Sequence, residues 1–94
     1  MRTIDRSTAF RRDFRRLRAD PRYRDIERLF LDIVTALVSD LPLPAQQRDH
    51  PLSGEWAGYR DCHLRFDLVL IYRKRGAEVL ELLRIGSHSE LFGK

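Results

Sequence analysis

Apolar residues in the first part of the chain recur at helical spacing. Phe10, Phe14 and Leu17 stand at positions i, i+4 and i+7, which is the period of one face of an α-helix. Ser7 or Thr8 just before them is a residue type that caps a helix start. The pattern predicts a first helix whose arginines lie mostly off the apolar stripe, on the solvent side.

A second apolar stripe follows Asp20-Pro21, a capping side chain before a proline that suits the first helical position. The stripe consists of Tyr23, Ile26, Leu29, Phe30, Ile33 and Leu37. It predicts a second helix that runs to about Ser39 and forms a hairpin with the first. Segment 41–44 contains two prolines and ends this helix, and the chain to Gly54 is expected to be loop.

From Trp56 onward the pattern is typical of strands. Segments 59–64, 67–73 and 78–85 are rich in aliphatic, aromatic and β-branched residues, and segment 73–76 has the turn chemistry to join the last two. Residues 2–5 are expected to form a short first strand. The order β-α-α-β-β-β predicts an α+β fold in which an N-terminal helical hairpin packs on an antiparallel sheet.

The length of 94 residues allows one domain, 1–94, and no repeat or linker indicates a second. A hydrophobic share of 43% is that of a globular chain. The single cysteine, Cys62, has no partner for an internal disulfide and is expected to pack in the core. No apolar run is long enough to span a bilayer, so we expect a cytoplasmic protein without a membrane partner.

Basic residues are concentrated early in the chain. Lys and Arg number 18 against 14 Asp and Glu, a net charge of +4, and ten arginines against five acids lie between Arg2 and Arg28. Arginine suits bidentate contact with phosphate or carboxylate, so an acidic partner, nucleic acid or protein, fits this region. A solvated helix face is the simpler alternative. The candidate contacts to RNA are Arg11, Arg12, Arg15 and Arg16.

Chemically useful side chains gather at one end of the predicted sheet. With turns near Arg65 and Arg75, antiparallel pairing places His63 opposite Asp67 and brings Arg84 back on the far side of that strand. His88 follows shortly after. RNA cleavage without a metal needs a base, an acid and a cation for the phosphate, and these residue types supply all three.

The chain lacks a glycine-rich phosphate loop, paired zinc cysteines and an H-E-x-x-H motif, so we expect no metal and no cofactor. Structural explanations stand beside the catalytic one. His50 fits a surface turn, His63 a half-buried strand position, and Asp67 with Arg84 a cross-strand ion pair. Trp56 and Phe92 are either core residues or surfaces on which bases stack.

Several spaced motifs carry a family resemblance. They are Leu41-Pro42-Leu43-Pro44, Asp49-His50-Pro51-Leu52-Ser53-Gly54, Trp56-Ala57-Gly58-Tyr59-Arg60-Asp61-Cys62-His63, Asp67 with Leu70-Ile71-Tyr72, Arg84-Ile85-Gly86-Ser87-His88, and Leu91-Phe92-Gly93. This series resembles the YafQ branch of the RelE superfamily of type II toxins. The resemblance implies a RelE-like endoribonuclease that enters the ribosomal A site, cleaves mRNA and is blocked by an antitoxin protein.

The resemblance also implies roles for particular residues. His50, His63, Asp67 and His88 are expected to do acid–base work, with His88 as the acid and Asp67 or His63 as the base. The phosphate charge is then assigned to Arg84, and Phe92 positions a base or the backbone. The partners implied are the ribosome with its 16S rRNA, mRNA and the antitoxin, and the arginines of the first helix become candidates for rRNA contact.

Two departures from the family pattern concern the flanks of Asp67. The family often has a tryptophan after this aspartate and a proline before it, where this chain has Leu68 and Phe66. A stacking role of that tryptophan is then lost or moves to Trp56 or Phe92. Two other functions remain open: a ParE-like toxin that inhibits a protein target such as gyrase, and a non-catalytic nucleic-acid-binding module.

Overall fold

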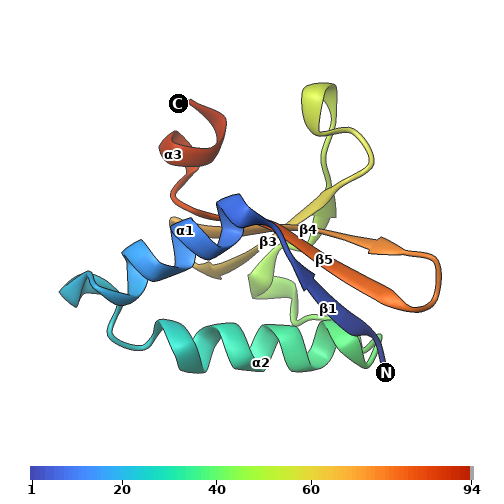
Figure 1. Cartoon of the computed structure of the whole chain (residues 1–94). Coiled ribbons are helices and arrows are strands. Elements are labelled where there is room, and N and C mark those ends of the chain that lie inside the picture. The colour runs from blue at the N-terminus through green and yellow to red at the C-terminus, as the bar shows by residue number, and fades with distance from the viewer. Residues whose placement is uncertain (94) are drawn as a thin grey trace.

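The computed structural model describes residues 1–93, so Lys94, the end of the predicted domain, lies outside the described residues. Figure 1 shows the elements, whose order contains the predicted β-α-α-β-β-β series together with a short strand and a C-terminal helix that the sequence did not predict. They are β1 (Thr3–Arg6), α1 (Thr8–Arg18), η1 (Pro21–Tyr23), α2 (Ile26–Val38), η2 (Ala45–Gln47), β2 (His50–Pro51), η3 (Gly54–Trp56), β3 (Arg60–Arg65), β4 (Leu68–Arg75), β5 (Val79–Gly86) and α3 (His88–Phe92), where η marks a 3₁₀ turn.

The five strands form one sheet in the order β1-β5-β4-β3-β2. Strands β3, β4 and β5 are the antiparallel meander expected from the sequence. The expectation of a purely antiparallel sheet is wrong at one edge, because β1 runs parallel to β5 and makes the sheet mixed. A two-residue strand, β2, also lies in the segment expected to be loop, where His50 pairs with Asp61 of β3. Hydrophobic alternation reveals neither edge, since it does not say which strands become neighbours.

Both predicted helices are present, and the first begins where expected. The Ser7 hydroxyl oxygen accepts a hydrogen bond from the backbone N–H of Phe10 at 2.9 Å and caps α1. The second starts later than predicted. Asp20 caps only the short turn η1, and α2 begins at Ile26 because Asp25, with φ −96° and ψ 12°, interrupts the helical backbone.

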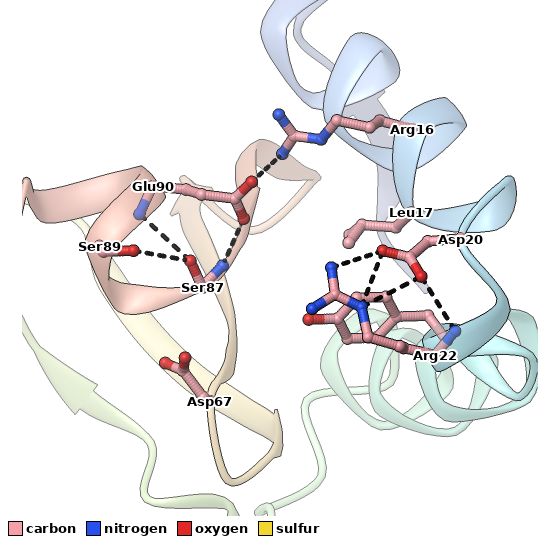
Figure 2. A pocket seen from close by; sticks show the side chains of 9 residues that line it. Arg16, Leu17, Asp20, Arg22, Asp67, Ser87, Ser89 and Glu90 are labelled. Carbon is pink, nitrogen blue, oxygen red and sulfur yellow. Dashed lines mark hydrogen bonds and ion pairs between the residues drawn. The ribbon is translucent and has the colours of Figure 1, made fainter.

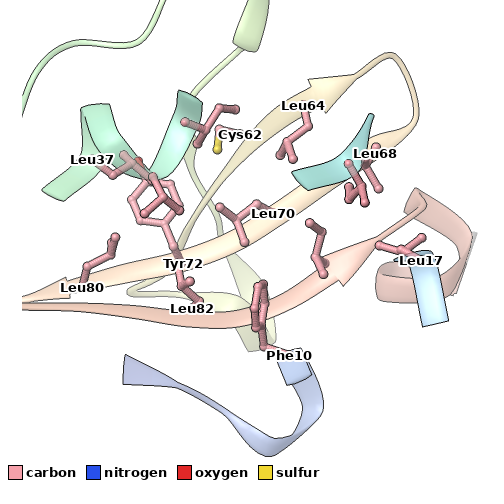
Figure 3. Packing of buried hydrophobic residues seen from close by; sticks show 14 of the residues in the cluster. Phe10, Leu17, Leu37, Cys62, Leu64, Leu68, Leu70, Tyr72, Leu80 and Leu82 are labelled. Atoms are coloured by element: carbon pink, nitrogen blue, oxygen red, sulfur yellow. The ribbon is translucent and has the colours of Figure 1, made fainter. Parts of the chain in front are cut away.

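Helices α1 and α2 cover one face of the sheet, while α3 and the segment around η3 lie over the other (Figure 1). The main core forms under the two long helices, where Phe10 and Leu37 meet Leu70 and Leu82 of the sheet (Figure 3). Cys62 is fully buried there, which confirms its expected packing role. Burial of each large apolar side chain contributes about 1.5–3 kcal/mol to folding.

The opposite face carries a smaller apolar cluster. Val69 and Ile71 of β4 are buried there against Leu91 of α3, with Trp56 and Phe92 packed at the side. Two polar side chains of β3, Asp61 and His63, are also buried on this face. The candidate catalytic residues His63 and His88 lie on this face. Within residues 1–93, no helix combines the length and the apolarity needed to cross a bilayer.

Candidate active site

The β3–β4 hairpin brings the candidate residues toward α3. Phe66 and Asp67 occupy its turn, so Asp67 lies in the loop, and His63 pairs with Val69 rather than with Asp67 as expected, because the turn follows Arg65 instead of being centred on it. A bulge between His63 and Arg65 shifts the register by one further residue. The predicted proximity of His63, Asp67 and His88 nevertheless holds through side-chain contacts.

Asp67 holds His88 by two hydrogen bonds to one carboxylate oxygen. Its Oδ1 accepts the backbone N–H of His88 at 3.0 Å and lies 2.6 Å from Nδ1 of the imidazole. These contacts, the backbone one foremost, lower the pKa of Asp67, so the carboxylate is ionised and only accepts. The proton therefore sits on Nδ1 of His88, and Nε2 is the nitrogen left for other partners.

Helix α3 fixes the position of His88 through its cap. Ser87 Oγ accepts the N–H of Glu90 at 3.2 Å, and Glu90 Oε1 accepts the N–H of Ser87 at 2.9 Å, a reciprocal capping box. A Cβ on Gly86 would stand 2.9 Å from that Glu90 oxygen, so glycine makes room for the cap. The other Glu90 oxygen pairs with Arg16 of α1 at 2.9 Å (Figure 2).

His63 and His88 are joined by a hydrogen bond between their rings. Their Nε2 atoms are 3.2 Å apart, so one nitrogen must donate and the other accept. Burial lowers the pKa of His63, which the negative charge of Asp61 opposes. His63 is thus a neutral imidazole near pH 7, and its second nitrogen, Nδ1, is buried without a hydrogen-bond partner among residues 1–93.

A third imidazole, that of His50, lies on the same face next to a buried carboxylate. His50 Nε2 is 2.8 Å from Oδ1 of Asp61, which is only 3% exposed, yet the contact lacks hydrogen-bond geometry and leaves that oxygen unsatisfied. Burial raises the pKa of Asp61, and the charges of the neighbouring histidines counteract the rise. Nδ1 of His50 lies 3.1 Å from the carbonyl oxygen of Pro51.

Asp49 ties the segment that carries His50 to the sheet. Its Oδ1 accepts the hydroxyl of buried Tyr72 at 2.6 Å and Nε of Arg60 at 3.2 Å. These bonds cross from the loop to β3 and β4. They hold β2 at the sheet edge, which places His50 beside Asp61.

Arg84 does not lie in the cluster as expected. Its Nε and Nη2 bind the two carboxylate oxygens of Asp13 at 2.6 and 3.2 Å, and Asp13 is fully buried on α1. The alternative of a cross-strand pair with Asp67 is therefore wrong as well. The cause is tertiary: β1 ends opposite Leu82, and beyond it Asp13 takes the next place at the edge of β5, where it accepts the N–H of Ile85 at 3.2 Å.

The aromatic candidates differ in position. The Phe92 ring centroid lies 6.1 Å from that of His88, whereas Trp56 packs edge-on against Tyr59 with a centroid distance of 5.6 Å. Both are partly buried. The four candidate arginines of α1, at positions 11, 12, 15 and 16, are exposed, although Arg12 contacts Asp13 and Arg16 pairs with Glu90.

A hollow of about 390 Å³ opens beside Asp67, between α3 and the end of α1. Figure 2 shows Arg16 and Arg22 on the side opposite Ser87 and Asp67. Two guanidinium groups thus line the same hollow as the Asp67 carboxylate. Within residues 1–93, the His, Cys, Asp and Glu side chains form no group of three or more that is arranged to hold a metal ion.

Two important carboxylates were not among the sequence candidates. Asp61 alternates with His63 on β3 and so had to share its face, which is a signal that the sequence already contained. Asp13 interrupts the apolar stripe between Phe10 and Leu17 at helical spacing, so a buried, paired carboxylate was foreseeable there. Its partner Arg84, 71 positions away, was not.

The arrangement has counterparts among known proteins. Residues 2–93 match the model of the bacterial toxin of type II toxin–antitoxin systems, YafQ. The mRNA interferase toxin YafQ of Escherichia coli strain B is 39% identical over 92 residues, which covers 98% of this chain and 97% of the relative.

Solved structures agree with the sequence match. A copper-bound mutant toxin from Helicobacter pylori superposes with a TM-score of 0.90 at 35% identity, covering 98% of this chain and all (100%) of that chain. The E. coli DinJ–YafQ complex gives a TM-score of 0.85 at 37% identity over 99% of this chain and 100% of that chain. These likenesses support the predicted RelE-like fold.

Proposed function

Because this chain belongs to the YafQ family of bacterial type II toxins, we propose that the row Asp67–His88–His63 is its catalytic centre. The protein is the toxin of a toxin–antitoxin pair and an endoribonuclease of the mRNA interferase class. The observation that carries the assignment of the centre is the pair of contacts at 2.6 and 3.2 Å that join these three side chains. The proposed chemistry is acid–base catalysis by side chains, without a metal.

The two imidazoles suit the two proton transfers of RNA cleavage. The 2′-oxygen forms a bond to phosphorus as the P–O5′ bond breaks, so one proton leaves the 2′-hydroxyl and another reaches the 5′-oxygen. We assign His63 as base and His88 as acid, which keeps one of the two bases expected from the sequence. The assignment requires His88 as an imidazolium with a proton on each nitrogen, whose Nε2 proton passes to the 5′-oxygen, since Nδ1 stays bonded to Asp67. It also requires neutral His63 with its proton on Nδ1, so that the free Nε2 takes the proton of the 2′-hydroxyl once RNA separates the two rings.

Asp67 is assigned the role of positioning His88 rather than that of base. Its Oδ1 is already bound to Nδ1 and to the backbone N–H of His88. A carboxylate in this place fixes the tautomer and the ring orientation and stabilises the imidazolium, as in the triad of serine proteases. His50, held beside Asp61, completes the polar surface. A catalytic row of this kind favours the nuclease over an inhibitor of gyrase or a simple RNA-binding module, neither of which needs it.

The remaining candidates are proposed to bind RNA. Phe92, next to His88, and the partly exposed Trp56 can contact bases. Arg84 is proposed to act on the phosphate charge only indirectly, because Asp13 already binds two of its nitrogens. Four exposed arginines of α1, Arg11, Arg12, Arg15 and Arg16, are assigned to 16S rRNA in the A site, with a salt-dependent affinity.

The partner of the toxin is an antitoxin protein, as DinJ is for the related YafQ. A small domain offers few groups to align the 2′-hydroxyl with the phosphate, and alignment is worth several kcal/mol of barrier. We therefore propose that the ribosome presents the message and that cleavage takes place in the cytoplasm on translating ribosomes.

The test measures cleavage of a short mRNA on programmed ribosomes by primer extension, with naked RNA in parallel. Wild-type protein should cut the ribosome-bound message much faster than naked RNA. His88→Ala should reduce the rate by about 10²- to 10⁴-fold, the range for loss of an acid–base group. Thr35→Ala, on the exposed side of α2, is the matched control and should cut like wild type.

Circular dichroism of His88→Ala must match wild type for the comparison to count as chemistry. Full activity of a folded His88→Ala would refute the catalytic row. Equal cutting of naked and ribosome-bound RNA would refute the ribosome dependence while leaving the row intact.

A further inference from the structure

Phe66 is an apolar side chain in an unusual place. Its side chain is 91% exposed, and it occupies the β3–β4 turn directly before the proposed catalytic Asp67. An exposed phenyl ring gains none of the stabilisation that burial gives an apolar side chain. Leu68, on the other side of Asp67, is fully buried in the core, so it has no surface on which anything could stack.

A second hollow lies beside Phe66 and is distinct from the one in Figure 2. It measures about 390 Å³, and its walls come from two segments, the η2 turn and the end of β3. Its lining residues are Gln46, Gln47, Arg48, His63, Leu64, Arg65 and Phe66. Because His63 also faces His88, this hollow adjoins the proposed catalytic row.

Two residues that line the hollow carry polar atoms without partners. Nδ1 of His63 and Oε1 of Gln47 are buried and make no hydrogen bond among the described residues. His63 as a whole is only 8% exposed. Buried polar atoms normally find partners, and an exception needs an explanation. A small rotation of these side chains toward the hollow would let the polar edge of a bound base satisfy them.

One cation at this rim is available. Arg48 is exposed and forms no ion pair among residues 1–93, and its backbone is left-handed, with φ 51°. This left-handed residue is the C-cap that ends the η2 turn. Arg65 is already engaged, since its Nη1 lies 2.8 Å from the carbonyl oxygen of Arg22 and 3.5 Å from Asp25.

We infer that Phe66, Gln47 and Arg48 form a nucleotide subsite next to the scissile phosphate, in which Phe66 stacks on a base. An aromatic face, a polar floor and a cation on the rim match the three parts of a nucleotide: its base face, its base edge and its phosphate. The inference rests on the proposed function, because the nucleotide is one that flanks the cleaved bond. Phe66 is thus a substrate-binding residue of this chain.

The experiment combines a protein change with a substrate change. Programmed ribosomes carry mRNAs in which the nucleotide 5′ or 3′ of the cut is an abasic ribose, and cleavage is measured with wild type, Phe66→Ala and Phe66→Trp. Loss of one base–aromatic stack lowers cleavage roughly tenfold. Phe66→Ala should therefore show about this loss, mainly in KM, and Phe66→Trp should recover it.

The abasic substrates separate stacking from a general disturbance. At one flanking position, removal of the base should slow wild type by a similar factor but have little further effect on Phe66→Ala, since the same contact is then lost only once. The pH profile of Phe66→Ala should match wild type. Leu31→Ala removes another exposed apolar side chain, 63% exposed on α2, and should leave cleavage unchanged.

Three results would overturn the subsite. They are a rate of Phe66→Ala within twofold of wild type, full additivity of the protein and substrate changes at both flanking positions, and weaker antitoxin binding by Phe66→Ala with unchanged cleavage, which would make this surface a protein interface. In each case cleavage by wild type and its loss in His88→Ala would leave the proposed function standing. Absence of cleavage by wild type would instead refute the proposed function itself.

Discussion

Two buried carboxylates, in different regions of the molecule, have opposite surroundings. Asp13, between α1 and the edge of β5, is fully buried and accepts hydrogen bonds from the guanidinium of Arg84 and the N–H of Ile85. Asp61, on the face of the sheet that carries the histidines, is 3% exposed and has an oxygen without a well-formed hydrogen bond. Burial by itself raises the pKa of both; at Asp13 the bonds to Arg84 and Ile85 outweigh it and lower the pKa, whereas at Asp61 the rise persists.

The difference separates a structural role from a functional one. A buried charge with all its partners in place holds two elements together, and here it fastens α1 to β5. A buried charge with missing partners destabilises the fold. Groups with shifted pKa values of this kind cluster at functional sites. The region of Asp13 should therefore respond to mutation in stability, and the region of Asp61 in catalysis.

The largest effect is expected from Asp13→Ala. It leaves the Arg84 guanidinium, with 23% of its side chain exposed, without its carboxylate, and breaking a buried pair costs about 3–5 kcal/mol of unfolding free energy. Urea unfolding should show this loss. The exposed Asp32 of α2 gives the matched control, Asp32→Ala, which should change stability by less than about 0.5 kcal/mol. A similarly small change in Asp13→Ala would remove the structural half of the comparison.

The fold could be predicted from periodicity for the helices and the meander but not for the sheet edges. Phe10 and Leu17 on one stripe and the aliphatic run of β4 determine local structure and the face that is buried. Which strand lies beside β5 depends on packing across the whole chain, and so does the pairing of Arg84 with Asp13. The candidate site was predictable in its residue types and in the proximity of His63 to His88. The register of its strands was not predictable, because no residue pattern indicates the turn at Phe66 and Asp67 or the bulge after His63.

The stability that Asp13 supplies should depend on pH. Its pKa in the folded protein is lowered, against the effect of burial, by its bonds to Arg84 and Ile85, so its contribution is present above the unfolded pKa and is lost as pH falls through the folded one. The stability difference between wild type and Asp13→Ala should be largest near neutral pH and shrink below about pH 4. Urea titrations from pH 7 to pH 3 measure it, and a difference that stays constant would contradict the ion-pair account.

Asp61→Asn should show the opposite pattern, with stability kept and cleavage reduced. Burial raises the pKa of Asp61 in the folded protein, so the folded state loses stability as pH rises through that pKa and the carboxyl group ionises. The neutral amide of the variant should therefore be at least as stable near pH 7. Cleavage should fall by less than the roughly 10²-fold or more that loss of an acid–base group costs, because His63 becomes a weaker base without the negative charge beside it.

The pH profile distinguishes this role of Asp61 from mere packing. The negative charge of Asp61 raises the pKa of His63 against the stronger effect of burial. Its removal should move the acidic limb of the rate profile to lower pH, because His63 then loses its proton more readily. Unchanged rates together with an unmoved limb would place Asp61 outside the catalytic machinery. A stability loss as large as that of Asp13→Ala would erase the distinction between the two regions.

The smallest effect is expected from Arg16→Ala, which tests how exposure scales these interactions on a single helix. Arg16 lies one turn after Asp13 on α1, and its pair with Glu90 is 52% and 38% exposed on the two sides. Water and salt screen such a pair, so its loss should cost less than about 1 kcal/mol and less still in high salt. Glu90 keeps its capping bond to Ser87 in the variant, so α3 should remain folded and hold His88 near Asp67. Cleavage should then fall by no more than a few-fold, with the pH profile unmoved.

Cleavage rates of Arg16→Ala and Arg16→Lys at low and high salt test this prediction. A loss as large as that of His88→Ala would show that α1 controls the catalytic row through the exposed pair. It would also show that exposure does not distinguish the weak ion pair of Arg16 from the strong one of Asp13.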